Sequence, residues 1–263
     1  MGLKLKTKIF ITFAYYQNRM KKILLYPITL FYYFVYMVVL CTIQPLQWLA
    51  FKIFGDKGLK ISFDYVAFFS LRCNNILGTR FTFENRELIP KGVPVIFVAN
   101  HQSLLDTAGI IWYLRKFNCL FVTKQELAKG IPSISYFLRN GKYVCIDRSN
   151  PKQAIPKIKS LAEYIEKESY SAVIFPEGTR SKTGIPNTFA ESGLKILCKY
   201  APSAYIVPIT INNSWKVYQY GYFPLSVGHH LFFTVQKPLK VSDYSFEEIL
   251  KKTEKSIIDG IKN

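Results

Sequence analysis

The sequence lacks the cysteine and histidine patterns that hold zinc ions or build disulfide frameworks. Its cysteines stand singly, and no C-x-x-C pair occurs among positions 41, 73, 119, 145 and 198. His229 and His230 have no cysteine nearby, so we expect no metal site. An odd, scattered set of cysteines indicates a reducing compartment, and Cys119 and Cys145, set in apolar runs, are expected to act as small core residues.

The glycine-rich loops that bind nucleotides are also absent. Neither G-x-x-x-x-G-K-[ST] nor G-x-G-x-x-G occurs, which argues against a nucleotide-hydrolysing or dinucleotide-binding site. The G-x-S-x-G turn of many serine hydrolases is missing as well. We therefore expect a protein without a bound cofactor.

Acidic residues are scarce. The 263 residues include 17 aspartates and glutamates against 35 lysines and arginines, a formal net charge of +18. Such an excess favours an anionic partner: nucleic acid, a membrane surface or a phosphorylated substrate. The basic residues belong to no recognised nucleic-acid-binding module, so we expect no nucleic acid partner.

Charged side chains are missing altogether from Ile23 to Phe51, a run of 29 residues. A run of this length is long enough to cross a bilayer as a helix. The alternative is a core helix of a soluble protein. A secretory signal peptide fits poorly, because the run is too long and has no small-residue cleavage site.

Basic residues flank this uncharged run on both sides, with Lys21 and Lys22 before it and Lys52 and Lys57 after it. Because basic flanks favour the cytoplasmic side, one clean crossing fits poorly. We expect a segment that dips into the membrane and returns, or lies in the interface, with the apolar stretch 61–71 as its returning partner. We assign residues 1–60, or on to 72, to a membrane-anchoring helical segment that holds the rest of the chain on the cytoplasmic face of a membrane (the inner membrane in a bacterium).

From residue 78 onward, short apolar runs alternate with stretches of helical spacing. The expected strands are 94–99, 119–123, 142–147, 171–175, 204–211 and 230–236, and the expected helices are 104–116, 125–139, 152–168, 188–200 and 245–261. This alternation predicts an α/β domain over residues 73–263, with a mostly parallel sheet flanked by helices. The last two strands have no helix between them and are expected to run antiparallel.

Polar clusters follow three of the expected strands. Asn100-His101 follows the first, Asp147-Arg148 the third, and Glu177-Gly-Thr-Arg180 the fourth. In open α/β sheets ligands bind beyond the carboxyl ends of the strands, so these clusters indicate one functional site. Lys124 also ends an expected strand, although a lone lysine or arginine such as Lys124 or Arg148 is more often a solvated charge.

His101 and Asp106 have two interpretations. Histidine suits proton removal at neutral pH, and a turn between the strand and a helix starting near Ser103 can fold Asp106 back onto Nδ1. That contact would leave Nε2 free to take a proton. The alternative is helix capping, because Ser103-Leu-Leu-Asp106 fits the S-x-x-D pattern. Both can hold at once.

The segment FPEGTRSK, residues 175–182, can be an ordinary surface turn. A turn, however, needs neither the carboxylate of Glu177 nor the guanidinium of Arg180. Arg180 can bind a phosphate through two parallel hydrogen bonds, and Gly178 lets backbone N–H groups approach a ligand. Glu177 can hold Arg180 in position or contact a substrate hydroxyl.

Two blocks in this order resemble the glycerolipid acyltransferases, typified by the 1-acyl-sn-glycerol-3-phosphate acyltransferases. Asn100 to Asp106, NHQSLLD, matches that family's NHxSxxD block with its HxxxxD motif, and Phe175 to Ser181 matches its FPEGTRS block. The flanking stretches and YIVPITI also resemble the family, so the similarity spans roughly residues 78–212. Ser135 stands where the family usually has glycine, and Ala190 where lysine is common.

The resemblance implies transfer of a fatty acyl group from coenzyme A or acyl carrier protein to a lipid hydroxyl, most simply that of lysophosphatidic acid. It makes His101 the base and Asp106 its orienting partner, with no metal and no acyl-enzyme. Glu177, Gly178, Thr179 and Arg180 would bind the acceptor phosphate, and Lys124 and Arg148 would line the same crevice. The partners are then lysophosphatidic acid, the acyl donor and membrane lipids.

Three other functions remain open from the sequence. The first is acylation of another lipid acceptor, such as a lyso-aminolipid, which would not require a phosphate. The second is a thioesterase, which would consume the thioester without an acceptor. The third is a basic membrane- or nucleic-acid-binding protein, which would keep its function without His101.

Overall fold

The structure is a computed structural model that describes residues 2–141, 143–146 and 151–262. The helices are α1 (Gly2–Cys73), α2 (Leu105–Tyr113), α3 (Ile134–Asn140), α4 (Pro151–Glu168), α5 (Glu191–Tyr200) and α6 (Phe246–Asp259). The strands are β1 (Arg80–Glu84), β2 (Val95–Ala99), β3 (Cys119–Lys124), β4 (Val144–Ile146), β5 (Ser171–Ile174), β6 (Tyr205–Asn212), β7 (His230–Val235) and β8 (Leu239–Lys240).

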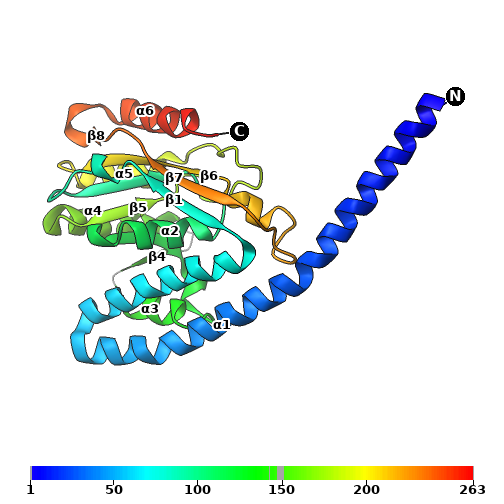
Figure 1. The fold of residues 1–263 in the computed structure, drawn as a ribbon. Helices are drawn as coiled ribbons and strands as arrows, with labels where there is room; N and C mark the ends of the chain where they lie inside the picture. Colours follow the sequence, from blue (N-terminus) through cyan, green and yellow to red (C-terminus); the bar gives the residue numbers. More distant parts are fainter. Residues whose placement is uncertain (1, 142, 147–150, 263) are drawn as a thin grey trace.

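The strands form one mixed sheet in the order β1-β7-β6-β2-β5-β3-β4, with β8 paired to β6 (Figure 1). Strands β2 to β6 run parallel to one another, while β7 pairs antiparallel with β6, as expected for the last two strands. The expected α/β fold is therefore confirmed. The carboxyl ends of β2, β5 and β6, the three central strands, meet at one edge of the sheet.

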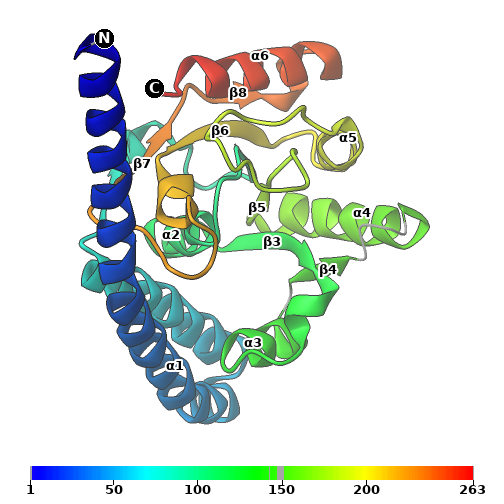
Figure 2. The same cartoon turned by 90° about the vertical axis from the view of Figure 1, so that its right-hand side faces the viewer.

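Both faces of the sheet are buried, which explains why its central strands are mostly apolar on both faces. Val95, Phe97 and Ala99 of β2 belong to the hydrophobic cluster that also contains residues of α1, α2 and α3. Ile96 and Val98, on the opposite face, belong to a second cluster with α4, α5 and α6. Figure 2 shows these two groups of helices around the sheet.

Strand β1 was not expected, and two helices start later than expected. β1 (RFTFE) lies at the sheet edge and pairs with β7 only, and its side chains are half-buried apart from the exposed Arg80, so it has no continuous apolar run. The segment 125–139 is a 3₁₀ turn over Gln125–Ala128 followed by α3, since Gly130 and Pro132 separate the two. α5 begins at Glu191 instead of residue 188. Residues 142 and 147 of the expected strand 142–147 lie outside the described residues.

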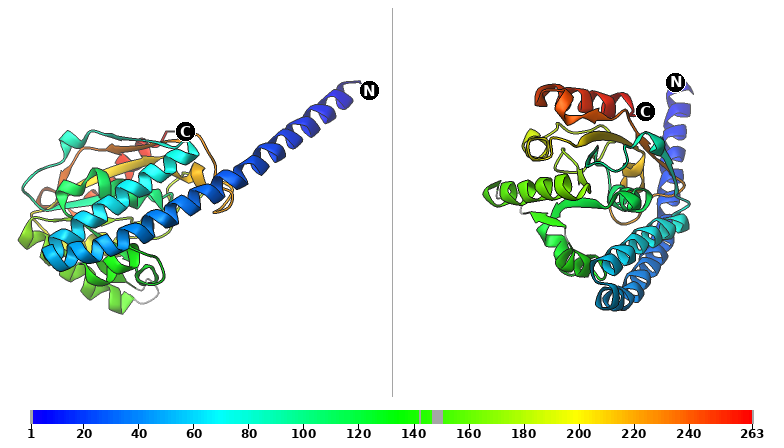
Figure 3. Two further views of the ribbon diagram at one scale, coloured as in Figure 1. Left: turned by 60° about the horizontal axis from the view of Figure 1, so that its bottom comes forward. Right: turned by 90° about the vertical axis from the view of Figure 1, so that its left-hand side faces the viewer.

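Helix α1 is a helical hairpin with two arms, residues 2–54 and 56–73. Gly55, with φ 56° and ψ −144°, breaks the helix between them, a conformation open to glycine but costly for other residues. Figure 3 shows the two arms running side by side. The stretch 61–71, expected to be the returning partner, lies in the second arm, and its Phe63 stacks on Phe137 of α3 with 3.6 Å between ring centroids.

The first arm presents one stripe of side chains to the α/β domain. The stripe is spaced as one face of a helix and consists of Thr29, Tyr32, Tyr36, Leu40, Ile43 and Gln47, which are buried apart from the half-buried Tyr36. Hydrogen bonds anchor it at both ends. The Leu225 N–H donates to Thr29 Oγ1 at 2.9 Å, and the Ser133 hydroxyl donates to the Leu40 carbonyl at 2.8 Å.

The opposite face of the first arm exposes large apolar side chains, among them Leu24, Leu30, Phe31 and Phe34. The helical stretch Lys22–Leu77 is long and apolar enough to cross a membrane by length and composition. An apolar outer face beside a buried inner stripe is typical of a helix that lies between a domain and a lipid surface.

Candidate active site

The site forms where the loops after β2 and β5 leave the same edge of the sheet. β2 and β5 are hydrogen-bonded neighbours, and Val98 pairs with Ile174. The segments that follow, around His101 and Glu177, are therefore brought together although 76 residues separate them. Two further bonds join these loops: the His101 N–H donates to Glu177 Oε1 at 2.6 Å, and the Ser181 N–H donates to the His101 carbonyl at 2.8 Å.

The imidazole of His101 contacts the carboxylate of Asp106, as the spacing predicted. Nδ1 lies 2.9 Å from Oδ2. Because an ionised carboxylate only accepts, the contact places the proton on Nδ1 and the lone pair of the neutral ring on Nε2. In the described part of the chain Nε2 has no hydrogen-bond partner. His101 is thus set up to accept a proton from a ligand.

The turn that places Asp106 is also a helix start, so the contact with His101 and the contacts of a helix cap occur together. α2 begins at Leu105, and the N–H groups of Gln102 and Ser103 donate to Asp106 Oδ2 at 2.6 and 2.8 Å. The Ser103 hydroxyl accepts from the Leu105 N–H at 3.1 Å. A carboxylate in the first turn also suits the helix dipole.

Asp106 is fully buried and receives one bond that the sequence did not indicate. The hydroxyl of Ser214, just after β6, makes a short hydrogen bond to Asp106 Oδ1. Gln102 holds this serine in place, because its Oε1 accepts from the Ser214 N–H at 3.0 Å. These donors hold the carboxylate of Asp106 in one orientation.

The ring of His101 stacks on Phe175, with 4.2 Å between centroids and 21° between planes. Its side chain is 12% exposed, whereas that of Asp106 is fully buried. The aromatic wall and the carboxylate therefore leave only a small part of the imidazole open to a ligand.

Glu177 supports the histidine loop. Its Oε1 accepts from the His101 N–H, and its Oε2 accepts from the backbone and side-chain amides of Asn187 at 2.6 and 3.0 Å. Burial raises the pKa of this carboxyl above its usual 4.5, and the N–H donors of Asn187 and His101 oppose that shift. With both oxygens engaged, Glu177 makes no described contact to Arg180.

Arg180 lies at the open side of the same loop, which turns at Gly178 (φ 65°). Its Nη1 donates to the hydroxyl of Tyr222 at 2.7 Å. Thr179, between Gly178 and Arg180 in the sequence, is exposed. Neither Tyr222 nor Asn187 was predicted as part of the site.

Of the two remaining predicted residues, Lys124 is not joined to this cluster. Lys124 ends β3 on the far side of β5, where it is exposed. Arg148 lies outside the described residues. Among the residues that are described, no group of three or more metal-ligating side chains could hold a metal ion.

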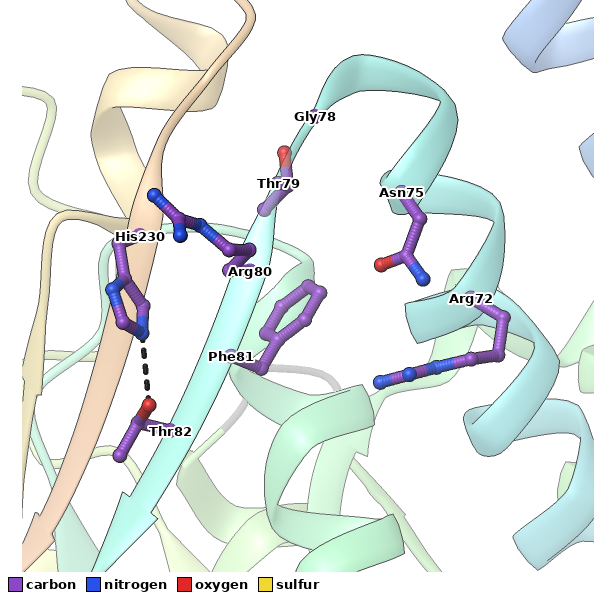
Figure 4. Close-up of a pocket in the computed structure, with 8 residues that line it drawn as sticks. All are labelled: Arg72, Asn75, Gly78, Thr79, Arg80, Phe81, Thr82 and His230. Carbon is purple, nitrogen blue, oxygen red and sulfur yellow. Dashed lines mark hydrogen bonds between the residues drawn. The ribbon is translucent and has the colours of Figure 1, made fainter.

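A separate cavity of about 540 Å³ lies between the end of α1 and β1 (Figure 4), lined by Arg72, Asn75, Gly78, Thr79, Arg80, Phe81, Thr82 and His230. It contains none of the predicted site residues.

Comparison with known proteins points to the acyltransferases, the family that the two sequence blocks resemble. The model of the acyltransferase family matches residues 80–212. The chain is 32% identical to a 1-acyl-sn-glycerol-3-phosphate acyltransferase of Cocos nucifera over 66% of this chain and 54% of the relative. It is 27% identical to that of Limnanthes douglasii, over 59% and 53%, and 33% identical to that of Helicobacter pylori, over 47% and 50%. The chain spans about half the length of these curated relatives.

Among solved structures, the crystal structure of the 1-acyl-sn-glycerophosphate acyltransferase of Thermotoga maritima matches with a TM-score of 0.74. The match covers 92% of this chain and 95% of that one at 24% sequence identity. At this identity the match supports the fold alone.

Proposed function

The chain belongs to the acyltransferase family, and from this premise we propose that it transfers a fatty acyl group from an acyl thioester to the free hydroxyl of 1-acyl-sn-glycerol 3-phosphate. The product would be phosphatidic acid, a precursor of membrane phospholipids. The names of the relatives from Cocos nucifera and Helicobacter pylori support this acceptor. The donor is a thioester of coenzyme A or of acyl carrier protein.

The observation that carries the proposal is the His101–Asp106 contact with Nε2 left open. Nε2 takes the proton of the acceptor hydroxyl while the hydroxyl oxygen attacks the carbonyl carbon of the thioester. The resulting tetrahedral intermediate expels the thiolate, which takes the proton back from Nε2. Asp106 stabilises the imidazolium between these two proton transfers, as in catalytic triads. No group on the enzyme is acylated, and the ester replaces the thioester.

Arg180 is the proposed ligand of the acceptor phosphate, together with the backbone of Gly178 and Thr179. A guanidinium binds phosphate through two parallel hydrogen bonds, and this one lies on the loop that is bonded directly to His101. Glu177 contributes by fixing that loop. Lys124, at the end of β3, would extend the basic surface around Arg180 toward the donor or the acceptor, and we propose the same role for Arg148, which lies outside the described residues.

We propose that α1 holds the site against the cytoplasmic face of a membrane without crossing it. If the first arm spanned the bilayer, the loops bonded to Thr29 and Leu40 would have to enter the bilayer with it. Loops with exposed polar backbone groups do not occur at that depth in contact with lipid. An arm lying in the interface also lets the acceptor, itself a membrane lipid, reach His101 from the leaflet.

The test is an acyl-transfer assay with purified protein, lysophosphatidic acid and labelled acyl-coenzyme A or acyl carrier protein. Phosphatidic acid should form with one or both donors, and the His101→Ala protein should form it at least about 10²-fold more slowly. A monoacylglycerol and a lyso-aminolipid serve as competing acceptors. Faster acylation of either than of lysophosphatidic acid would contradict the proposed acceptor, and thioester loss without any acylated lipid would indicate a thioesterase.

Arg180→Lys gives a separate test of the acceptor site. Lysine keeps the charge but loses the planar pair of donors, so the acceptor KM should rise by about tenfold or more while the donor KM changes little. Equal changes in both KM values, or a change for the donor alone, would assign Arg180 to the donor instead.

A further inference from the structure

Tyr222 connects Arg180 to the membrane anchor. Its hydroxyl accepts a hydrogen bond from Arg180 Nη1 at 2.7 Å. Its backbone carbonyl accepts one from the hydroxyl of Tyr33, in the first arm of α1, also at 2.7 Å. One residue is therefore bonded at one end to the proposed phosphate ligand and at the other to the helix. Tyr33 and Tyr222 lie 189 residues apart in the sequence.

The loop that carries Tyr222, residues 219–227, is fastened to the first arm at three further points. The Leu225 N–H donates to the buried hydroxyl of Thr29 at 2.9 Å. The ring of Phe223 packs edge-on against Tyr26, with 5.1 Å between centroids. Lys22 lies over the ring of Tyr220 at 5.3 Å. The position of this loop is thus set by the helix and not by the sheet alone.

Arg180 has no carboxylate to hold it, because both oxygens of Glu177 are engaged by His101 and Asn187. No ion pair to Arg180 occurs among the described residues. A long arginine side chain at the open side of a loop samples many rotamers, and ordering it when a ligand binds costs free energy. A fixed acceptor such as the Tyr222 hydroxyl removes part of that cost beforehand while leaving the other guanidinium N–H groups for a phosphate.

We propose that Tyr222 is a positioning residue for the acceptor phosphate: it orients the Arg180 guanidinium, and the first arm of α1 orients Tyr222. The inference rests on the proposed function, in which Arg180 binds that phosphate. Its consequence is that the anchor takes part in acceptor recognition as well as in attachment. The rings of Tyr222 and Phe223 are 58% and 51% exposed, and Phe223 packs on Tyr26, which is itself exposed on the first arm. An acceptor leaving the leaflet along this part of the arm meets Arg180 in its oriented form.

The experiment compares full-length wild type with Tyr222→Phe, which removes the hydroxyl and keeps the ring. For lysophosphatidic acid we expect the acceptor KM to rise by about tenfold, the order expected for one hydrogen bond to a charged group, with kcat and donor KM unchanged. Tyr33→Phe should change the same constant in the same direction by a smaller factor. Tyr220→Phe is the matched control, since Tyr220 lies on the same loop and its hydroxyl is not bonded to Arg180.

A double variant tests whether Tyr222 acts through Arg180. If it does, the double variant has the same acceptor KM as Arg180→Lys alone. If the two residues act independently, the factors by which each substitution raises the acceptor KM multiply in the double variant. If the two substitutions raise the acceptor KM by factors that multiply, the inference is wrong. It is also wrong if Tyr222→Phe has the acceptor KM of wild type while Arg180→Lys is impaired. In both cases the proposed function stands. If wild type acylates monoacylglycerol as well as lysophosphatidic acid and Arg180→Lys is unimpaired, the proposed acceptor and the inference are both wrong.

Discussion

At the scale of single residues, the geometry around His101 predicts how the rate should fall when the base is removed. His101→Ala should lower kcat by about 10²–10⁴-fold, the range for loss of a general base, with little change in the acceptor KM. Single-turnover assays with labelled thioester measure this. Activity close to that of wild type, in a protein that unfolds at the same temperature, would exclude His101 as the base.

Ser214 offers a milder change at the same site. Ser214→Ala removes one donor from Asp106 and leaves the backbone bonds of Gln102 and Ser103 in place. Because Asp106 then orients and stabilises the imidazolium less well, kcat should fall by about tenfold, less than in His101→Ala. Ser203→Ala is the control, because Ser203 is exposed and lies just before β6, at the opposite end of that strand from Ser214. An unchanged kcat in Ser214→Ala would mean that the backbone donors suffice.

The contact between His101 and Asp106 could be predicted because it is local: a strand end, a turn and a helix start place residues five apart in contact. Ser214 could not, because its bond to Asp106 spans 108 residues and depends on β6 lying beside β2. Asn187 was missed for a related reason, since an exposed asparagine gives no local signal that it bonds to Glu177. The roles of the predicted phosphate-binding residues stay predictions.

At the scale of elements, α2 positions Asp106 and packs tightly on the sheet. A Cβ added at Gly109 would lie 2.4 Å from the ring of Phe233 on β7. Gly109→Ala should therefore destabilise the protein by about 1–3 kcal/mol despite the better helix propensity of alanine, and kcat should fall because α2 is displaced. Urea unfolding and the acyl-transfer assay measure the two effects.

Gly193→Ala in α5 is the matched control. Its added Cβ would meet only the end of the Ile174 side chain, which can move, so the free energy of unfolding should change little. Equal stability of wild type and Gly109→Ala would show that α2 has room to shift.

Helix α6 begins with a reciprocal capping box, in which Ser245 and Glu248 each bond to the other's backbone N–H. These bonds hold the pKa of the Glu248 carboxyl below its usual 4.5. A depressed carboxyl pKa contributes stability that is present above the unfolded-state value and lost as pH falls through the folded-state value. The difference in unfolding temperature between wild type and Ser245→Ala should therefore be largest near neutral pH and shrink below pH 4.5. A difference that stays constant under acid would contradict this assignment.

The central elements could be predicted because their burial leaves a plain signal. β2, β5 and β6 are mostly apolar and almost entirely buried, since both faces of the sheet are covered. β1 gives no such signal at its edge, and the start of α3 depends on Ser133, which adopts a positive φ and bonds to the carbonyl of Leu40 in α1. The hairpin in α1 was expected from the apolar stretch 61–71, but its packing into the catalytic core was not, because periodicity does not reveal a partner surface.

At the scale of the whole molecule, both arms of α1 should lie on one side of the membrane. Single cysteines at Lys6 and Lys57, in a background without the native cysteines, should react with an impermeant thiol reagent only from the cytoplasmic side. A single crossing would instead place one basic flank or the basic α/β domain outside, against the positive-inside tendency. Labelling of the two positions from opposite sides would exclude the same-side arrangement.

The stripe from Thr29 to Gln47 has a practical consequence for anyone who wants this protein free of detergent. Deleting the first arm would uncover Tyr32's neighbours in the core and leave the amide of Leu225 without its acceptor, so the shortened chain should aggregate. The outer face offers another route, because Leu24, Leu30, Phe31 and Phe34 contact solvent or lipid and not the domain. Replacing these four with glutamate or lysine should keep the inner packing and the proposed acceptor site while weakening the attachment of the first arm to detergent and lipid.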